Sequence, residues 1–366
     1  MPAGFYSIKV DQIIRETKDA VRVVLDVPEH LKPQFEYKAG QYLTFSIMLN
    51  GEEVRRSYSL CSSPVVDNKP SIAVKEIEGG KMSTYLNNEL KEGDMLEIMP
   101  PMGKFVLVPE SSASNNYMLF GGGSGITPLI SIIKTSLHTE PNSKCVLVYA
   151  NRDEDSVIFE KDLQELESAH ENLKVIYTYD NPKNAWDGHT GFLTKDKVSD
   201  LARQELGLNY PVAKYYTCGP APLMDVVVEG LSGIGVRDEN IFTEYFTAKA
   251  KSTEDAKAVV NTEDTSSALN YSEEVREREI NVEVYGEVKK ITVKPTETIL
   301  IAAQKEGMDP PYSCTVGVCT TCRARLKSGK ASMDEREGLS DAEIDEGYIL
   351  TCQAHPLSDD VDLIFE

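Results

Sequence analysis

The first hundred residues form a series of short apolar runs separated by turn signals. Five runs are β-branched or alternate apolar with polar positions, as half-buried strands do: FYSIKV, VRVVLDV, YLTFSIML, SIAVKEI and MLEIMP. Turn signals such as Asn50-Gly51 and Gly79-Gly80 bound them, and one segment, MSTYLNNEL, has helical spacing. Because closure removes exposed strand edges, the pattern predicts an antiparallel β-barrel over residues 1–110.

The pattern changes at Tyr117, where apolar strands begin to alternate with amphipathic helices. The predicted strands are YMLF, VLVYA, LKVIYTY and AKYYT, and a helical stretch of ten to fifteen residues follows each of them. Such alternation indicates βα units, so residues 111–248 are expected to form an α/β domain with a doubly wound parallel sheet.

The last third of the chain divides into a polar segment and a small mixed domain. Residues 249–278 are rich in Ala, Ser and Thr and lack periodicity, which predicts a linker, although a transient helix also fits. Over residues 279–366, INVEVYG and KKITV predict a hairpin, and TILIAAQKEG predicts a helix before a group of cysteines.

Length and charge narrow the class of protein. A chain of 366 residues is too long for one ordinary core, and its net charge of −21 argues against a nucleic-acid partner. No apolar run approaches the roughly 18 residues of a membrane span, and the start MPAGFYSIKV lacks a secretory signal. We therefore expect a soluble cytoplasmic protein with no nucleic-acid or membrane partner.

The cysteines are sparse but unevenly distributed. Seven are present, too few for a disulfide framework, and four of them lie in the last 53 residues. Cys314, Cys319 and Cys322 form a C-x4-C-x2-C motif that Cys352 follows, which is the plant-type spacing for a 2Fe–2S cluster. A zinc site is the alternative, but such sites usually combine two CxxC pairs or include His, and His355 is the only nearby imidazole.

Two weak motifs in the predicted barrel fit a flavin. Arg56 can neutralise a pyrophosphate, while Tyr58 and Ser59 offer a flat ring and a hydroxyl donor. Downstream, Gly80-Lys81-Met82-Ser83-Thr84 opens a helix, whose N-terminus is an anion site. Each motif alone also fits an ordinary exposed strand or helix start.

Two further motifs fit a pyridine nucleotide. Gly121-Gly122-Gly123-Ser124-Gly125-Ile126-Thr127-Pro128 lies between a strand and its helix, where bare glycines let backbone amides approach a pyrophosphate. It is not the G-x-G-x-x-G fingerprint, because Ile126 stands where the third glycine would fall. CGPAPLM, at 218–224, follows a later strand.

Taken together and in this order, the motifs resemble those of the ferredoxin-NADP reductase superfamily, and residues 279–366 resemble plant-type ferredoxins with a β-grasp fold. The domain order is similar to that of the reductase components of multicomponent oxygenases. The resemblance implies FAD, NAD(P)H and a 2Fe–2S cluster, with FMN as an alternative flavin. It implies flavin contacts from Arg56, Ser57, Tyr58, Ser59, Val74, Lys75, Gly80, Met82, Ser83 and Thr84. It implies nucleotide contacts from Gly122, Gly123, Ser124, Gly125, Thr127, Pro128, Asn151, Arg152, Ser156, Cys218, Gly219, Pro220 and Met224.

The same resemblance implies a hydride transfer that needs no general acid or base. Ser59 would support the flavin, Cys218 would hold the nicotinamide edge, and Glu244 would balance charge nearby, which makes these three the predicted catalytic residues. Thr178-Tyr179-Asp180 stands where NADPH-preferring members carry Ser-Arg, and acidic residues follow Arg152, so we expect NADH as the donor.

Three functions fit these features: a reductase that feeds an oxygenase, a self-contained diaphorase with another acceptor, and a non-catalytic redox sensor. A complete hydride-delivery apparatus favours the first two. The predicted ferredoxin domain carries 17 acidic and 9 basic residues, and seven of the acids lie within 334–346. We expect an oxygenase or another redox-acceptor protein to dock on this acidic surface.

Overall fold

The computed structural model describes residues 4–246, 258–261 and 275–365. The chain divides into two compact units, one spanning Tyr6–Phe246 and the other comprising Thr247–Glu366 with Met1–Phe5. Within the described parts of the chain, no helix is both long and apolar enough to cross a membrane.

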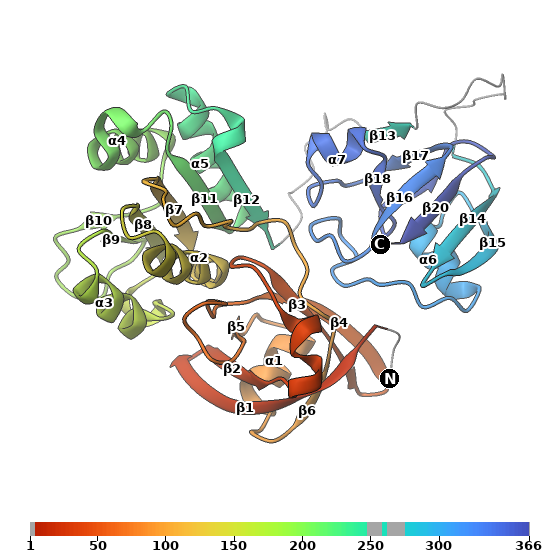
Figure 1. Cartoon of the computed structure of the whole chain (residues 1–366), viewed down its shortest axis with the longest axis horizontal. Helices are drawn as coiled ribbons and strands as arrows, with labels where there is room; N and C mark the ends of the chain where they lie inside the picture. Colours follow the sequence, from red (N-terminus) through yellow and green to blue (C-terminus); the bar gives the residue numbers. More distant parts are fainter. Residues whose placement is uncertain (1–3, 247–257, 262–274, 366) are drawn as a thin grey trace. The chain divides into compact units, whose positions relative to one another are not determined.

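The first unit begins with a closed antiparallel barrel (Figure 1). Its strand order is β4-β3-β6-β1-β2-β5, and the bridge between Leu60 and Ile72 joins the end of β4 to β5, so the two edge strands meet. Asn50 and Gly51 both have positive φ between β3 and β4, which suits the tight hairpin turn that their sequence predicts. The strands are β1 (Tyr6–Thr17), β2 (Ala20–Asp26), β3 (Tyr42–Leu49), β4 (Glu52–Ser59), β5 (Ser71–Lys75) and β6 (Met95–Ile98). A 3-10 helix, Glu29–Phe35, and helix α1, Lys81–Asn88, cover the barrel.

A parallel sheet with order β10-β9-β8-β7-β11-β12 follows the barrel. Strand β7, the first of these strands in the chain, has β8, β9 and β10 on one side and β11 and β12 on the other, so the strand order reverses there. In such sheets, ligands bind outside the carboxyl ends of the strands at this reversal. The strands are β7 (Asn116–Gly122), β8 (Lys144–Asn151), β9 (Leu173–Tyr179), β10 (His189–Thr190), β11 (Lys214–Gly219) and β12 (Ile241–Tyr245). The helices are α2 (Ile126–Thr139), α3 (Glu160–Ala169), α4 (Lys195–Leu206) and α5 (Ala221–Gly233).

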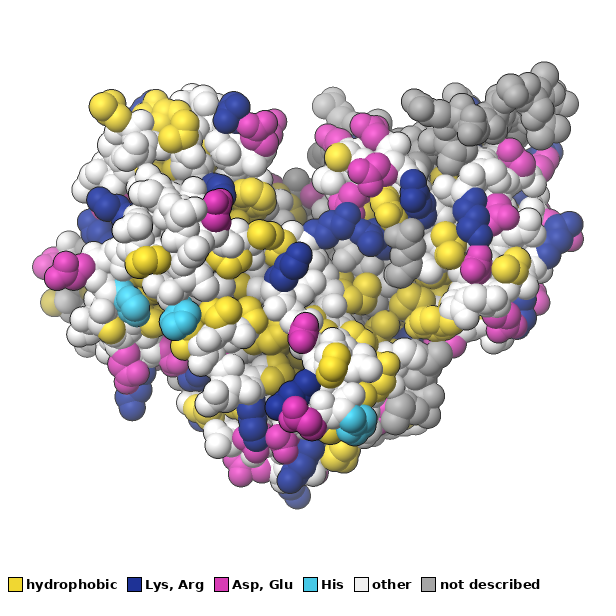
Figure 2. All heavy atoms as spheres, viewed as in Figure 1, with side chains coloured by type: hydrophobic (Ala, Val, Ile, Leu, Met, Phe, Trp, Pro, Cys, Tyr) yellow, Lys and Arg dark blue, Asp and Glu magenta, His cyan; other side chains and the backbone are white. Residues whose placement is uncertain are grey.

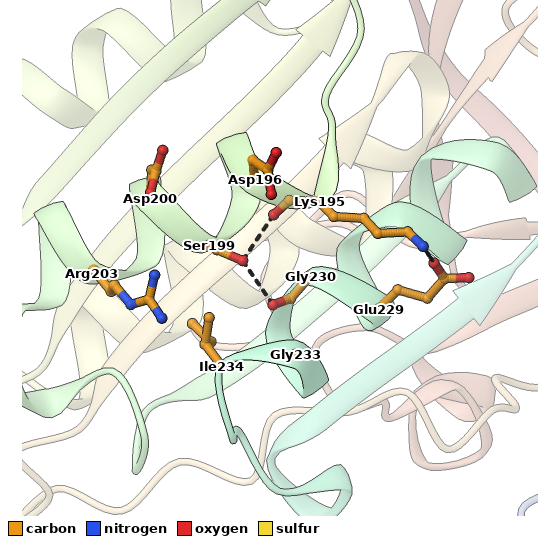
Figure 3. A pocket seen from close by; sticks show the side chains of 9 residues that line it. All are labelled: Lys195, Asp196, Ser199, Asp200, Arg203, Glu229, Gly230, Gly233 and Ile234. Carbon is orange, nitrogen blue, oxygen red and sulfur yellow. Dashed lines mark hydrogen bonds and ion pairs between the residues drawn. The ribbon is translucent and has the colours of Figure 1, made fainter.

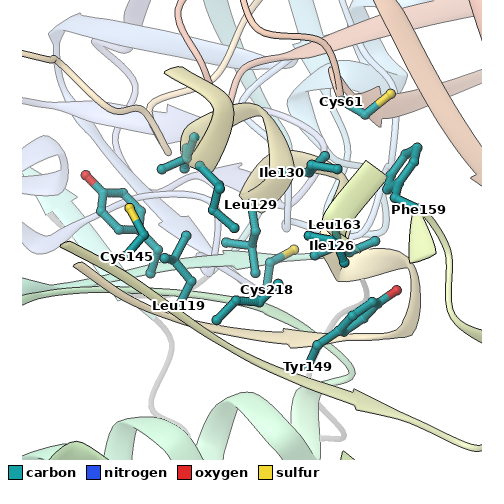
Figure 4. Close-up of a cluster of buried hydrophobic side chains, with 14 of the residues drawn as sticks. Cys61, Leu119, Ile126, Leu129, Ile130, Cys145, Tyr149, Phe159, Leu163 and Cys218 are labelled. Carbon is teal, nitrogen blue, oxygen red and sulfur yellow. The ribbon is translucent and has the colours of Figure 1, made fainter. Parts of the chain in front are cut away.

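Alternate strand residues fill two separate cores on the two faces of this sheet. Leu119 and Leu147 pack with α2 and α3 on one face, as Figure 4 shows for part of that core. Phe120 and Val148 pack with α4 and α5 on the other. Covering a parallel sheet on both faces is the doubly wound arrangement that the sequence predicts.

The barrel and the α/β domain share a core and several polar contacts. Phe105 and Leu107, which follow β6, belong to the same buried cluster as α2. Ser131 of α2 donates a hydrogen bond of 2.6 Å to the carbonyl of Ser62, and Arg22 of β2 donates two to Asp162 of α3. These contacts fix the barrel against the α/β domain as one unit.

The second unit contains a five-stranded mixed sheet and a small three-stranded sheet. The larger has the order β15-β14-β20-β16-β18, with β14 and β20 parallel, and helix α6 packs in its core. This arrangement fits the predicted α+β ferredoxin-like domain. Its elements are β14 (Arg278–Val284), β15 (Glu287–Val293), α6 (Ile299–Lys305), β16 (Arg323–Ser328), β17 (Lys330–Met333), α7 (Asp341–Asp345), β18 (Tyr348–Leu350), β19 (Ala354–Pro356) and β20 (Asp362–Phe365).

The segment predicted as a linker contains one strand. β13, Ala258–Asn261, pairs antiparallel with β17 and completes the three-stranded sheet β13-β17-β19. Most of the predicted linker, residues 249–257 and 262–274, lies outside the described residues.

Candidate functional site

The predicted flavin residues lie at the end of β4 on the barrel. Arg56 is exposed, and its guanidinium donates to the carbonyl of Arg55 at 2.7 Å. Ser57 shares a hydrogen bond of 2.9 Å with Thr44, and the ring of Tyr58 packs edge-on against Phe45. The strand therefore presents an exposed cation, a hydroxyl and a half-buried ring in a row, which fits a flavin with its phosphates near Arg56.

Helix α1 provides the second predicted flavin segment. Ser83 donates to the carbonyl of Gly80 at 3.3 Å and accepts from the amide of Ile77, so its hydroxyl fixes the start of the helix. A Cβ on Gly80 would lie 2.3 Å from the Ser83 Oγ, so any residue larger than glycine at this position would clash with the Ser83 hydroxyl. Met82 is 2% exposed and packs in the barrel core, so its side chain is not presented to a ligand.

The ends of strand β5 and helix α1 are tied together by a residue that the sequence analysis does not single out. Asn87 is buried and its amide donates to the carbonyls of Val74 and Ser83. Lys75 forms an ion pair of 3.8 Å with Asp19. The predicted contacts Val74, Lys75, Ser83 and Thr84 therefore belong to one rigid corner of the barrel.

The glycine loop lies at the reversal of strand order, against the end of β11. A Cβ on Gly125 would lie 2.0 Å from the carbonyl oxygen of Cys218, and one on Gly122 would lie 2.8 Å from Pro220. Gly123 has φ of +52°. The loop thus needs glycine to bring its backbone against β11, and it leads into the N-terminus of the 14-residue helix α2, a suitable pyrophosphate site.

The three predicted catalytic residues come from distant segments and meet at one place. Ser59 donates a hydrogen bond of 3.0 Å to the Glu244 carboxylate, and Glu244 on β12 pairs in register with Cys218 on β11. Burial raises the pKa of Glu244 to about 8, although the Ser59 hydrogen bond lowers it. Burial, and secondly Glu244, raise the pKa of Cys218 well above its ordinary value, so its thiol stays protonated. The site holds a neutral thiol and a carboxyl that can carry a proton near neutral pH; their catalytic roles stay predictions.

The predicted nucleotide contacts Asn151, Arg152 and Ser156 lie at or just after the end of β8. Asn151 is 5% exposed, and neither its Nδ2 nor its Oδ1 has a hydrogen-bond partner among the described residues. Unpaired buried amides are costly, so this one fits a residue that awaits a ligand. Ser156 is different, because its hydroxyl donates to the carbonyl of Asp153 and accepts from the Asp153 amide. Its side chain therefore caps a turn.

The four cluster cysteines gather around one loop of the second unit. The Sγ atoms of Cys314 and Cys319 are 3.1 Å apart, and Cys352 forms side-chain hydrogen bonds with Cys314 and Cys322. Hydrogen bonds from Cys319 and then Cys352 lower the pKa of Cys314, which favours its thiolate. Among the described residues, no group of three or more His, Cys, Asp or Glu is arranged to hold a metal ion. Four thiols close together instead fit a cluster of two irons, which takes four thiolates.

Backbone contacts hold the fourth cysteine against the loop. The amide and hydroxyl of Thr351 donate to the carbonyl of Cys322 at 3.1 and 2.9 Å, and Gln353 donates to the carbonyl of Thr315. Gly317 has φ of +79°, and a Cβ there would lie 2.7 Å from Glu335. The loop thus has little freedom, as a cluster site requires.

A cavity lies elsewhere in the described chain. It has a volume of about 500 Å³ and lies between α4 and α5 (Figure 3). Its lining is polar and includes the ion pair of Lys195 with Glu229. It contains none of the predicted site residues.

Comparison with known proteins defines the class. Residues 7–107 match an oxidoreductase FAD-binding domain, residues 119–229 an oxidoreductase NAD-binding domain, and residues 282–357 a 2Fe–2S iron-sulfur cluster binding domain. The chain belongs to the family of NAD(P)H-dependent oxidoreductases that join these three domains, and the predicted cofactors FAD, NAD(P)H and 2Fe–2S are confirmed.

Individual relatives narrow the resemblance. The chain is 34% identical to one of the subunits of 1,2-phenylacetyl-CoA epoxidase from Escherichia coli K12, over 99% of this chain and 98% of the relative. The domain order and motifs of this chain also look most like those of the phenylacetyl-CoA epoxidase reductase subunit, so the motifs and the overall identity agree. It is also 34% identical to the ferredoxin reductase component of 3-ketosteroid-9-alpha-monooxygenase of Rhodococcus rhodochrous, over 100% and 99% of the two chains. Phthalate dioxygenase reductase, a solved structure, shares the fold with a TM-score of 0.58 at 24% identity, over 99% and 98% of the two chains.

Proposed function

We propose that this protein is the reductase component of a multicomponent oxygenase, taking electrons from NADH and delivering them to the oxygenase through its 2Fe–2S domain. The observation that carries the proposal is the presence, in one chain, of a flavin barrel, a nucleotide domain and a gathered set of four cysteines. When bound, the flavin accepts a hydride and releases its two electrons one at a time, as a 2Fe–2S cluster requires.

The residues that meet near Ser59 give the site its geometry. The Cys218 thiol is neutral and buried, so it acts as a wall of the nicotinamide site and not as a nucleophile. Ser59 orients the Glu244 carboxyl, which can hold a proton beside the flavin near neutral pH. Together they would position the nicotinamide and keep water from it.

The relatives support a choice of acceptor. Because the phenylacetyl-CoA epoxidase relative from E. coli matches along nearly the whole chain, an epoxidase that acts on an aromatic acyl-CoA is the acceptor we favour. None of the seven cysteines, all of which lie in the described parts of the chain, forms a disulfide, which supports a reducing, cytoplasmic location.

The acidic docking surface is smaller than the sequence suggests. Glu343 is buried, caps α7 through Ser340 and pairs with Arg323 at 3.1 Å. Asp345 and Glu346 are exposed at the end of α7, where acidic side chains gather in Figure 2. We therefore assign docking to this end of α7.

Stopped-flow mixing tests the proposed acceptor. The protein, reduced with NADH under anaerobic conditions, is mixed with the oxygenase component purified from the same organism. Cluster absorbance should return as the oxygenase is reduced, at a rate that rises with oxygenase concentration. A rate independent of the oxygenase would rule out this acceptor.

A further inference from the structure

Three consecutive acidic residues follow β8 beside the expected adenosine site. Gly122 of β7 is paired with Ala150 of β8, so the end of β8 lies next to the glycine loop. With the nicotinamide near Cys218 on β11, the adenosine half of a dinucleotide must extend to the opposite side of β7, over β8. The orphaned amide of Asn151 lies at this end.

Two cations lie close to this position, and both are neutralised. Arg152 contacts the Asp153 Oδ2 at 3.3 Å, and Lys183, which follows β9, contacts the same oxygen at 3.3 Å. Lys183 also pairs with Asp155 at 2.5 Å. Asp153 is 5% exposed, and it alone joins both cations.

Backbone donors of the same segment are also occupied. The amides of Lys183 and Asn184 donate to the two carboxylate oxygens of Glu154 at 2.9 and 3.2 Å. Consecutive amides aimed at one anion are a common phosphate-binding arrangement. Here a side chain of the protein fills it.

We propose that Asp153 and Glu154 act as an internal anion in the place where a 2′-phosphate would bind, and that they thereby make the enzyme select NADH over NADPH. A 2′-phosphate would need the donors of Arg152, Lys183 and the Lys183–Asn184 backbone, and it would meet two carboxylates that already hold them. An NADH ribose carries only a hydroxyl at this position, which needs none of these charged donors.

The inference rests on the proposed function, since it assumes that the domain binds a pyridine nucleotide for hydride transfer. The test measures nucleotide binding directly, by calorimetry on the full-length holoprotein. The probes are 5′-AMP and adenosine 2′,5′-bisphosphate, which differ only in the 2′-phosphate. The variants are Asp153→Asn with Glu154→Gln, and Glu154→Gln alone.

In the double variant, the affinity ratio of the bisphosphate to 5′-AMP should rise at least about tenfold, since charge-assisted contacts become available. Glu154→Gln alone, at a half-buried position, should shift the ratio in the same direction by less. Glu160→Gln is the matched control, because it removes a nearby exposed carboxylate that holds neither Arg152 nor Lys183. Its ratio should stay at the wild-type value.

Folding can be followed through the fluorescence of Trp186, the only tryptophan in the sequence. Its ring centroid lies 4.7 Å from that of Tyr179. If the ratio were unchanged in both acidic-site variants, or changed equally in Glu160→Gln, the internal-anion proposal would be wrong while the proposed function stood. If neither nucleotide bound the wild-type protein, the nucleotide site itself would be wrong, and both proposals with it.

Discussion

A carboxyl that carries a proton near neutral pH is the main electrostatic feature of the site formed by Ser59, Cys218 and Glu244. Its pKa of about 8 results from burial, which the Ser59 hydrogen bond only partly offsets. In an unfolded chain the same carboxyl would ionise near its ordinary pKa of 4.5. Between these two values the folded state binds more protons than the unfolded state, so the Glu244 contribution to stability falls as pH rises.

The variant Glu244→Gln should flatten this part of the stability profile. In the wild type, the free energy of unfolding should fall between about pH 5 and pH 8. A shift of one pKa unit corresponds to about 1.36 kcal/mol, and the loss per unit should be smaller than this because the Glu244 side chain is partly exposed. Denaturant unfolding at several pH values measures the difference between the proteins. Parallel profiles for wild type and variant would contradict the pKa assigned to Glu244.

The aromatic residue Tyr179 shows why a site cannot be engineered from sequence alone. The motif comparison suggests that arginine at this position would favour NADPH. The structure shows a side chain 3% exposed, stacked on Tyr177 and packed against Trp186. The partners of such a stack come from segments whose approach the sequence does not reveal.

We therefore expect Tyr179→Arg to lower the free energy of unfolding by about 2–4 kcal/mol, because it buries an unpaired charge and removes ring contacts. Urea unfolding followed by Trp186 emission measures the loss. A variant as stable as the wild type, with a gain for NADPH, would show that the guanidinium reaches solvent and would restore the sequence-based suggestion.

At the scale of elements, the close contact between the glycine loop and β11 fixes the shape of the proposed nucleotide site. Gly125→Ala should disrupt it, since the new Cβ would lie 2.0 Å from the carbonyl oxygen of Cys218. We expect flavin reduction by NADH to slow at least about 100-fold, as misplacement near a reacting centre commonly does. Gly233→Ala, in a helix with nothing within 4 Å, is the control and should be neutral or stabilising by up to about 1 kcal/mol. A Gly125 variant with normal reduction kinetics would contradict this role.

The element pattern of the sequence predicts most of the fold because amphipathic periodicity is strong in the α/β domain and in the barrel. It does not predict β12, Ile241–Tyr245, as an edge strand, although the motif containing Glu244 lies on it. It also misses β13, whose residues sit in a polar segment and form a strand only by pairing with β17. Ser59 and Glu244 are 185 positions apart and form a hydrogen bond. The expectation that both lie near the flavin comes from the family resemblance and not from periodicity.

The exposed end of α7 provides a test of docking. Asp345→Lys with Glu346→Lys should slow electron transfer to the oxygenase several-fold at low salt, with the difference shrinking as the Debye length falls below about 10 Å above 0.1 M. Glu306→Lys, an exposed reversal at the end of α6, is the control. Hydride transfer from NADH should be unaffected in both. If Glu306→Lys slowed electron transfer to the oxygenase as much as the double α7 variant, the effect would come from the change in net charge and not from docking at α7.

At the scale of the whole molecule, three cofactor domains lie in two compact units joined by a single chain. The flavin and nucleotide domains share one core, which suits a hydride transfer that depends on fixed geometry. The iron–sulfur domain has its own core. This domain must receive electrons from the flavin and pass them to a separate acceptor, and a domain with its own core suits both steps.

The central claim is that electrons leave through the 2Fe–2S cluster, and the variant Cys319→Ser tests it most directly. The measurement compares NADH-driven reduction of cytochrome c with that of a two-electron dye, alongside iron and flavin content. Cys145→Ala, which removes a buried thiol outside the cluster loop, is the control. We predict that Cys319→Ser loses its iron and at least about nine-tenths of cytochrome c reduction but keeps its flavin and its dye reduction. Full cytochrome c reduction in a protein without iron would show that electrons bypass the cluster and would contradict the account.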